Sequence, residues 1–265
     1  MQLESSESNG YPKLIFIEKE SHREGYREPV CRLDKDIRDA LPEHGWEPHD
    51  THAFRLWTHR DATDVICEIS DEGDQRFRLL RMRLFLYPVY RRAQESGGLP
   101  FHAALVERDG RGVLLAAPSR TGKSTCCRRL VAPWFALGDD ETLFVRDDKG
   151  RYFAHPFPTW SEYLGGRSQR TWNVERHVPL SAIFFLERGE TDQSLPVGQG
   201  KAASFINESA AQVGQRTWIR LPREEKRRLR RKAFDNACEL AKVIPAFKLR
   251  VSLNGRFWEE MEKVL

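Results

Sequence analysis

The sequence predicts an α/β protein in which a sheet is flanked by helices and preceded by a small, mostly β region. The first observation is a series of short apolar or alternating runs between residues 14 and 69, a pattern typical of strands. The second is a pair of short apolar runs, residues 113–116 and 182–186, which are typical of buried strands. The third is the recurrence of apolar residues every three or four positions in 77–93 and 222–243, which indicates amphipathic helices.

The N-terminal part is expected to form a separate small region. Residues 1–10 are polar and acidic and are expected to be a disordered tail, and residues 11–98 to form a small α+β region. Strands are expected at 14–17, 54–57 and 65–69, with turns in polar stretches such as 43–46. A helix is expected over 77–93, because apolar residues recur there at spacings of three and four: Leu79, Met82, Leu86 and Val89. The stretch Ser-Gly-Gly-Leu-Pro at 96–100 ends it and marks the boundary.

Residues 99–265 are expected to form the main domain. The runs 101–107 and 112–116 are separated by Arg-Asp-Gly-Arg, a hairpin signal. Further strands are expected up to Gly138 and at three later positions, 142–145, 182–186 and 247–251. Pro222 opens a helix that runs to about Val243, and a short helix closes the chain. The apolar stripe of the long helix consists of Leu229, Ala233, Ala237, Leu240 and Ala241.

Composition narrows the classes of protein. The formal net charge of +4 comes from 43 basic and 39 acidic residues, which suits a solvated surface and does not demand a polyanionic partner such as nucleic acid. No apolar run approaches the ~20 residues of a membrane span, and the N-terminus is unlike a signal peptide. The five cysteines show no paired metal spacing, which favours a reducing cytoplasm. Cys126 and Cys127 are expected to pack as small apolar side chains rather than act in redox chemistry.

The segment 117–125, Ala-Pro-Ser-Arg-Thr-Gly-Lys-Ser-Thr, has the context of a phosphate-binding P-loop, since an apolar run precedes it and a helix-like segment follows. Backbone N–H groups of such a loop surround nucleotide phosphates, and the next helix contributes roughly half a positive charge. Lys123 is expected to reach the β- and γ-phosphates, and the Ser124 hydroxyl to bind Mg²⁺. The residues expected to bind ATP are Ser119, Arg120, Thr121, Gly122, Lys123, Ser124 and Thr125.

Two positions depart from the usual P-loop pattern. Ala117 stands where the first glycine is expected, and Arg120 stands where related loops often carry glycine. A β-carbon restricts positive φ and close backbone approach, so either residue could tilt or weaken the loop. Arg120 could instead offer a guanidinium fork to phosphate oxygens. The alternative to a P-loop is a chance match in a basic loop, but the intact Gly-Lys-Ser-Thr favours nucleotide binding.

Asp139 and Asp140 form the second informative group. They follow the apolar run 134–137, so a strand can deliver both carboxylates to the edge where the loop lies. Phosphoryl transfer needs acidic groups to hold Mg²⁺ and to orient or deprotonate the acceptor hydroxyl. Adjacent strand residues point to opposite faces, so we expect the pair to divide these roles. The alternative is a polar turn after a strand.

His102 precedes the hairpin, where a histidine is more often a core residue than a functional one.

The basic run 227–232 can attract nucleic acid or an acidic peptide. Nearby acidic residues compensate part of its charge at i,i+4, which favours a solvated helix face.

Together these residues resemble the C-terminal domain of HPr kinase/phosphorylase. The resemblance is carried by Phe-His-Ala-Ala-Leu at 101–105, the loop at 117–125 and Leu-Gly-Asp-Asp-Glu at 137–141. It covers residues 99–190 well, with weaker echoes at Phe257-Trp258-Glu259. The sequence is most similar to HPr-kinase-like proteins of ribosomal peptide clusters, the SynChlorMet cassette protein ScmC group and the lasso-peptide precursor kinases.

The resemblance implies a P-loop kinase-type sheet and roles for specific residues. Asp139 would act as base toward a serine hydroxyl, Asp140 would lie near the metal as a ligand with Ser124, and His102 would lie by the transferred phosphate. The acceptor would be a small protein or precursor peptide. HPr kinases form hexamers, so a homo-oligomer is possible by analogy.

One part of the family pattern is expected to be missing here. It is a signature strand with Glu followed by Arg-Gly, which in that family supplies another magnesium ligand and phosphorylase activity. Arg167, Arg170 and Arg176 lie in a later loop and could substitute. Two alternatives to a kinase remain: an adapter that binds nucleotide and peptide without transfer, and a P-loop ATPase. The ATPase is favoured only by the apolar run 183–186 that ends in Glu187.

Overall fold

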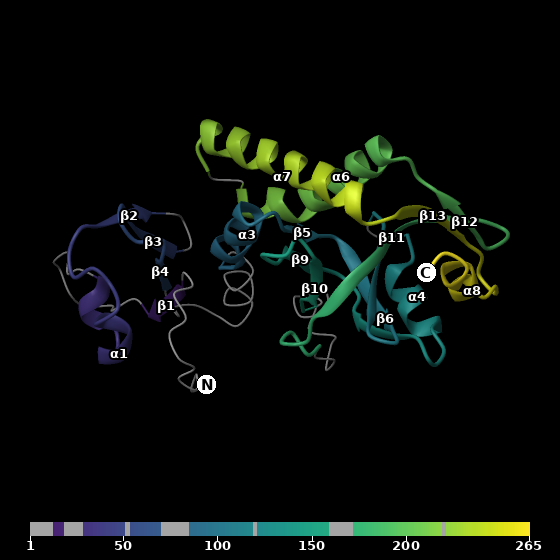
Figure 1. Cartoon of the computed structure of the whole chain (residues 1–265), viewed down its shortest axis with the longest axis horizontal. Coiled ribbons are helices and arrows are strands. Elements are labelled where there is room, and N and C mark those ends of the chain that lie inside the picture. The colour runs from purple at the N-terminus through teal and green to yellow at the C-terminus, as the bar shows by residue number, and fades with distance from the viewer. Residues whose placement is uncertain are drawn as a thin grey trace. The chain divides into compact units, whose positions relative to one another are not determined.

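The computed structural model describes residues 13–18, 29–50, 54–69, 85–118, 121–158, 172–218 and 221–265 (Figure 1). The chain forms two compact units, Met1–Val89 and Tyr90–Leu265. Helix α3 (Leu86–Glu95) crosses from the first unit into the second. Both units are mixed α/β, and each has a sheet of its own.

The N-terminal unit contains a four-stranded sheet in the order β1-β4-β3-β2. Its strands are β1 (Leu14–Glu18), β2 (Trp46–Asp50), β3 (Phe54–His59) and β4 (Val65–Ile69). The 3-10 helix η1 (Pro29–Arg32) and the short helix α1 (Lys35–Arg38) come between β1 and β2. The core of this unit joins Val30 and Leu33 to Trp46, Trp57 and Ile66. The strands predicted near 14–17, 54–57 and 65–69 are confirmed, whereas the polar sequence of β2 gave no signal.

The larger unit has a nine-stranded sheet within the described residues. The strand order is β5-β9-β10-β11-β7-β6-β8, with β13 beside β11 and β12 beside β13. Strands β7, β11 and β13 are parallel and form the centre. The strands are β5 (Leu99–Phe101), β6 (Ala103–Arg108), β7 (Arg111–Ala116), β8 (Phe135–Gly138), β9 (Thr142–Arg146), β10 (Tyr152–Pro156), β11 (Val178–Arg188), β12 (Gln193–Pro196) and β13 (Ala246–Val251).

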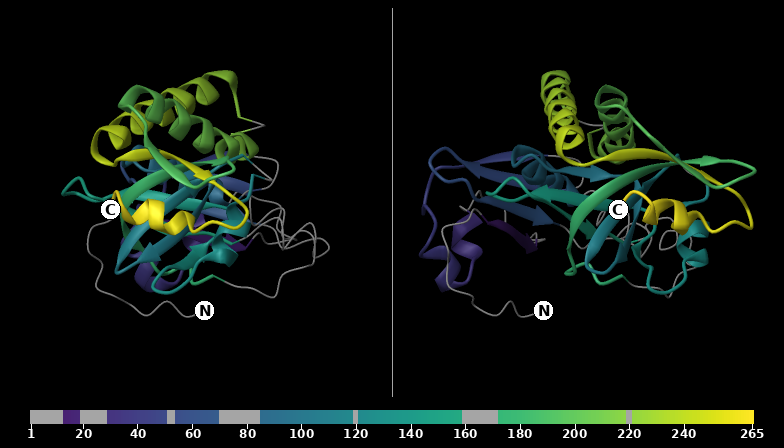
Figure 2. Two further views of the ribbon diagram at one scale, coloured as in Figure 1. Left: turned by 90° about the vertical axis from the view of Figure 1, so that its right-hand side faces the viewer. Right: turned by 45° about the vertical axis from the view of Figure 1, so that its right-hand side comes forward.

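Helices cover both faces of this sheet. The paired helices α6 (Gln199–Trp218) and α7 (Arg223–Val243) lie on one side. Helices α4 (Lys123–Arg129) and α8 (Phe257–Glu262) lie on the other, as Figures 1 and 2 show. Period-two alternation decides which strand residues meet which layer. Phe184 packs with the α4 and α8 side chains, and the next residue, Phe185, contacts Phe205 of α6.

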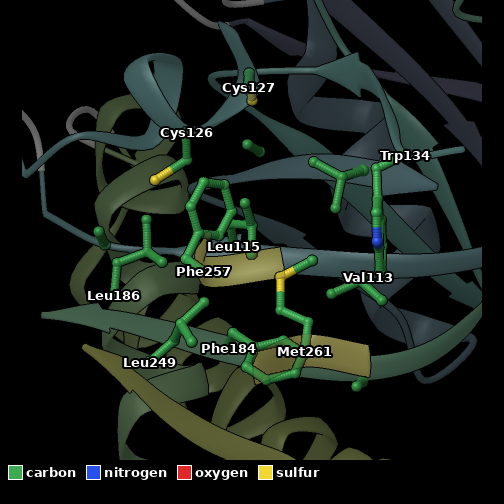
Figure 3. Packing of buried hydrophobic residues seen from close by; sticks show 14 residues of the cluster. Val113, Leu115, Cys126, Cys127, Trp134, Phe184, Leu186, Leu249, Phe257 and Met261 are labelled. Atoms are coloured by element: carbon green, nitrogen blue, oxygen red, sulfur yellow. The ribbon is translucent and has the colours of Figure 1, made fainter. Parts of the chain in front are cut away.

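The main hydrophobic core lies under α4 and α8. Figure 3 shows Phe257 and Met261 of α8 among Leu115, Phe184 and Leu249 of the central strands. Further members come from α4 and the turn before β8: Cys126, Cys127 and Trp134. The core thereby fixes α4, and with it the segment that immediately follows the glycine-lysine pair.

Most predicted elements of the main domain are confirmed. The hairpin has a two-residue loop in which both Asp109 and Gly110 have positive φ, 52° and 75°, as a type I′ turn requires. Helix α7 begins after Pro222 and ends at Val243. Helix α6 was not predicted, nor were β5, β10 and β12 as strands. Residues 1–10 and 77–84 of the predicted tail and helix lie outside the described residues.

Among the described residues, no helix combines the length and apolarity needed to cross a bilayer.

Phe257→Ala should destabilise the larger unit by about 3–5 kcal/mol, because it deletes a fully buried ring under the central strands. Urea unfolding followed by near-UV circular dichroism measures the change. The matched control is Phe234→Ala on α7, where the ring is 49% exposed and the cost should stay within about 0.5 kcal/mol. Equal effects of the two substitutions would contradict the described core.

Cys126 should resist alkylation in the folded protein. Burial raises the pKa of the Cys126 thiol to about 11, so at pH 8 only about one molecule in a thousand carries the reactive thiolate. Iodoacetamide followed by peptide mass spectrometry should label exposed Cys31 readily and Cys126 only after unfolding. Labelling of Cys126 as fast as Cys31 would show that this part of the core opens.

Candidate functional site

Three chain segments meet at one end of strands β6, β7 and β8 in the larger sheet. We call this end of the strands the sheet edge. Strands β6 and β7 are antiparallel with Ala103 opposite Ala116, so the start of β6 lies beside the end of β7. Strand β8 is antiparallel to β6 with Gly138 opposite Leu105, so its end lies at the same edge. Three predicted groups are therefore neighbours. The loop follows β7, the acidic pair follows β8, and His102 precedes β6.

The loop after β7 leads directly into α4. Gly122 is the N-cap of α4 and has φ 122° and ψ 10°, a conformation that side-chain-bearing residues rarely adopt. Thr121 donates its N–H to the Pro118 carbonyl at 3.4 Å, and Ser124 is half-buried. Thr125 is exposed and its hydroxyl accepts from Arg128. Ser119 and Arg120 lie outside the described residues.

Ala117 does not need the freedom of glycine. Among the described residues other than glycine, only Asp109 has a positive φ, so Ala117 adopts an ordinary backbone conformation. Its side chain is buried in the core beneath α4 and α8. A positive φ is therefore not required at Ala117, and whether its β-carbon weakens the loop stays a prediction.

Lys123 points into the protein rather than into solvent and is only 7% exposed. Its Nζ donates to the Ala117 carbonyl at 2.8 Å and lies 3.1 Å from His102 Nε2. Burying an ammonium group is costly unless polar groups solvate it, and these two acceptors supply part of that solvation. Lys123 thus links the start of the loop to the residue that precedes β6.

His102 is buried and is held from two directions. Its Nε2 faces Lys123 and also lies 3.5 Å from Asp140 Oδ1. Its Nδ1 lies 2.5 Å from Gln212 Oε1 on α6. Its backbone is tied to Ser209 on the same helix. His102 thus presents Nε2 to both a lysine and a carboxylate, contacts that an ordinary core histidine does not need.

The acidic residues after β8 occupy different environments. Asp140 is half-buried and reaches His102, whereas Asp139 is 6% exposed. The next residue, Glu141, is almost completely buried and accepts a hydrogen bond from the Tyr90 hydroxyl at 3.1 Å. Asp139 and Asp140 therefore differ in burial, and the division of roles between them stays a prediction.

Sequence reasoning missed three residues that support the site. Ser209 and Gln212 come from α6, whose sequence does carry a helical signal, since Ala202, Ile206 and Val213 repeat at spacings of four and seven. Tyr90 is the partner of Glu141 and lies in the predicted helix 77–93, but no motif marks it. All of these contacts join residues distant in sequence, which local patterns cannot reveal.

The later arginines are not part of the described site. Arg176 pairs with Glu107 and stacks over Phe135, and Glu107 lies near the end of β6 remote from His102. Arg176 therefore lies away from His102 and the acidic pair. The order Glu-Arg-Gly does occur at 187–189, at the end of β11, where the Glu187 carboxylate pairs with Lys248 and Arg250. Arg167 and Arg170 lie outside the described residues.

The described side chains of this site do not by themselves form a metal centre. Among the described residues, no group of three or more His, Cys, Asp or Glu side chains is placed to hold a metal ion. Mg²⁺ in nucleotide sites is typically held by one or two protein oxygens, substrate phosphates and waters. A hydroxyl at Ser124 and a carboxylate at Asp140 are oxygen ligands of the kind this requires.

A family model described as SynChlorMet cassette protein ScmC matches residues 65–265. The match covers most of the chain, so the protein belongs to the ScmC family, as the sequence motifs predicted. Comparison with curated protein sequences finds no match. The family description suggests a role in a biosynthetic cassette and states no activity.

Proposed function

For this member of the ScmC family, we propose an ATP- and Mg²⁺-dependent kinase with a P-loop, HPr-kinase-like main domain. It transfers the γ-phosphoryl group to a hydroxyl, most simply a serine of a small protein or ribosomally made precursor peptide. The observation that carries the proposal is the meeting of Lys123, His102 and Asp140 at the sheet edge where the glycine-bent loop enters α4.

The loop and Lys123 would hold the nucleotide. In P-loop proteins, backbone N–H groups cradle the phosphates and the lysine reaches the β- and γ-phosphates. The buried position of the Lys123 ammonium supports this role, because a polyphosphate would supply negative charge at a place shielded from water. Arg120 and His102 would steady the charge that develops on the transferred group.

The acidic pair would serve the acceptor and the metal. Asp139 would accept the proton of the acceptor hydroxyl as its oxygen attacks the γ-phosphorus and the bond to the β–γ bridging oxygen breaks, which releases ADP. Ser124 and Asp140 would hold Mg²⁺. When bound, the metal neutralises charge on the β- and γ-phosphate oxygens. The contrast between buried Asp139 and half-buried Asp140 supports separate roles.

No specific observation favours either of the two rival functions, the adapter or the ATPase. An adapter would bind nucleotide and peptide but leave the peptide unlabelled after incubation with labelled ATP. An ATPase would turn over ATP without an acceptor and would need an acid such as Glu187 near the loop. Strand β11 does run parallel beside β7, but the Glu187 carboxylate forms ion pairs with Lys248 and Arg250 of β13.

Asp139→Asn should reduce phosphoryl transfer at least about 100-fold while nucleotide affinity changes little, because the amide cannot accept the hydroxyl proton. Mass spectrometry of candidate peptides after incubation with Mg-ATP measures transfer, and titration with a fluorescent ATP analogue measures binding. The matched control is Asp148→Asn in the exposed turn after β9, which should leave both unchanged. Transfer that survives in Asp139→Asn would show that another group is the base.

Lys123→Met should weaken binding of the same ATP analogue at least about tenfold, since a charge-assisted hydrogen bond to phosphate is lost. Lys149→Met, an exposed lysine in the turn after β9, is the control and should bind as the unmodified chain does. Nucleotide affinity unaffected by Lys123→Met would remove the loop from the proposed site. Circular dichroism of each variant separates lost binding from lost folding.

A further inference from the structure

We propose that Gln212 on α6 is a positioning residue that fixes the tautomer of His102 and thereby the resting position of Lys123. The inference deepens the proposed function and rests on it, because it assigns to α6 a part in holding the phosphate-binding lysine. The three side chains form one line of contacts, from Gln212 Oε1 to His102 Nδ1 and from His102 Nε2 to Lys123 Nζ.

Helix α6 first fixes the backbone of His102. The His102 N–H donates to the Ser209 carbonyl at 3.4 Å, and the Ser209 hydroxyl donates to the His102 carbonyl at 3.2 Å. Ser209 and Gln212 are three residues apart, so they share one face of the helix. The backbone and the ring of His102 are therefore held by the same helical turn. Ser209 is itself buried, which makes its two bonds to His102 hard to replace with water.

The chemistry of the contacts determines the tautomer. A lysine ammonium group only donates, so the His102 Nε2 that lies 3.1 Å from Lys123 Nζ presents its lone pair to it. The Asp140 carboxylate, which would need a proton on the same Nε2, lies farther away at 3.5 Å. The ring proton of the neutral imidazole is then on Nδ1. Nδ1–H needs an acceptor, and Gln212 provides one through Oε1 at 2.5 Å. The orientation of the Gln212 amide follows from the same constraint, since its NH₂ group would oppose the Nδ1 proton.

Loss of Gln212 would release this constraint. Without an acceptor at Nδ1, the ring can take the Nε2–H tautomer, whose proton would face the Lys123 ammonium group. That arrangement is repulsive, so Lys123 would leave its position between His102 and Ala117. Asp140 lies 3.5 Å from the same Nε2 and would compete for the new proton. Both neighbours of His102 would thus be displaced by a change on a helix that contributes no predicted catalytic group.

Nitrogen-15 NMR of the His102 ring tests the assignment, since the protonated and unprotonated nitrogens of a neutral imidazole resonate at well-separated positions. Comparison with His102→Gln identifies the signals among those of eight histidines. We expect a protonated Nδ1 in the unmodified chain and in Gln212→Glu, which keeps an acceptor oxygen. In Gln212→Leu we expect a mixture of tautomers or the Nε2–H form. Gln215→Leu, an exposed glutamine on the same helix, is the matched control and should keep a protonated Nδ1.

Transfer kinetics provide the second measurement. Gln212→Leu should lower kcat about tenfold with a much smaller change in KM for ATP, Gln212→Glu should restore most of the loss, and Gln215→Leu should have none. A protonated Nε2 in the unmodified chain, or an unchanged tautomer in Gln212→Leu, would overturn the inference. If the unmodified chain transfers no phosphate to any acceptor, the proposed kinase fails, and the NMR spectra still decide whether Gln212 sets the tautomer.

Discussion

The candidate site depends on how the chain solvates one buried ammonium group. Lys123 Nζ donates to the Ala117 carbonyl at 2.8 Å and to His102 Nε2 at 3.1 Å, away from bulk water. An ammonium group is expensive to bury, so its acceptors must be held firmly. The core beneath α4 and α8 holds the Ala117 side chain, and α6 holds His102. Both helical layers therefore support the same side chain from opposite faces of the sheet.

Strand register is the second constraint. The two-residue turn at Asp109 and Gly110 pairs Ala103 with Ala116, which places His102 beside the residue that begins the loop. A slip of one residue would reverse the faces of β6 and move His102 away from Lys123. The pairing of Gly138 with Leu105 brings the acidic pair to the same edge. One hairpin turn and one further strand pairing thus assemble three segments that are separate in sequence.

The parts that could be predicted were those with local signals. The hairpin, the loop after β7, the acid-terminated β8 and the long helix α7 each carry a short pattern of turn residues or apolar spacing. Helix α6 also has such a pattern, in its alanines and Ile206. The contacts of Gln212 with His102 and of Tyr90 with Glu141 span 110 and 51 residues, and nothing local encodes them. Strand β2 was missed because its sequence is mostly polar.

The alanine at the first position of the predicted P-loop shows that a departure from a motif need not distort the backbone. Glycine is needed where φ is positive or where another backbone comes close, and Gly122 meets the first condition with φ 122°. Ala117 does not meet the first condition, because its φ is not positive, and its methyl group fills part of the core. The contribution of Ala117 to the site is its backbone carbonyl, which accepts a hydrogen bond from Lys123. Any residue with a small apolar side chain supplies that carbonyl equally well, so the motif is constrained at Gly122 and Lys123 more tightly than at its first position.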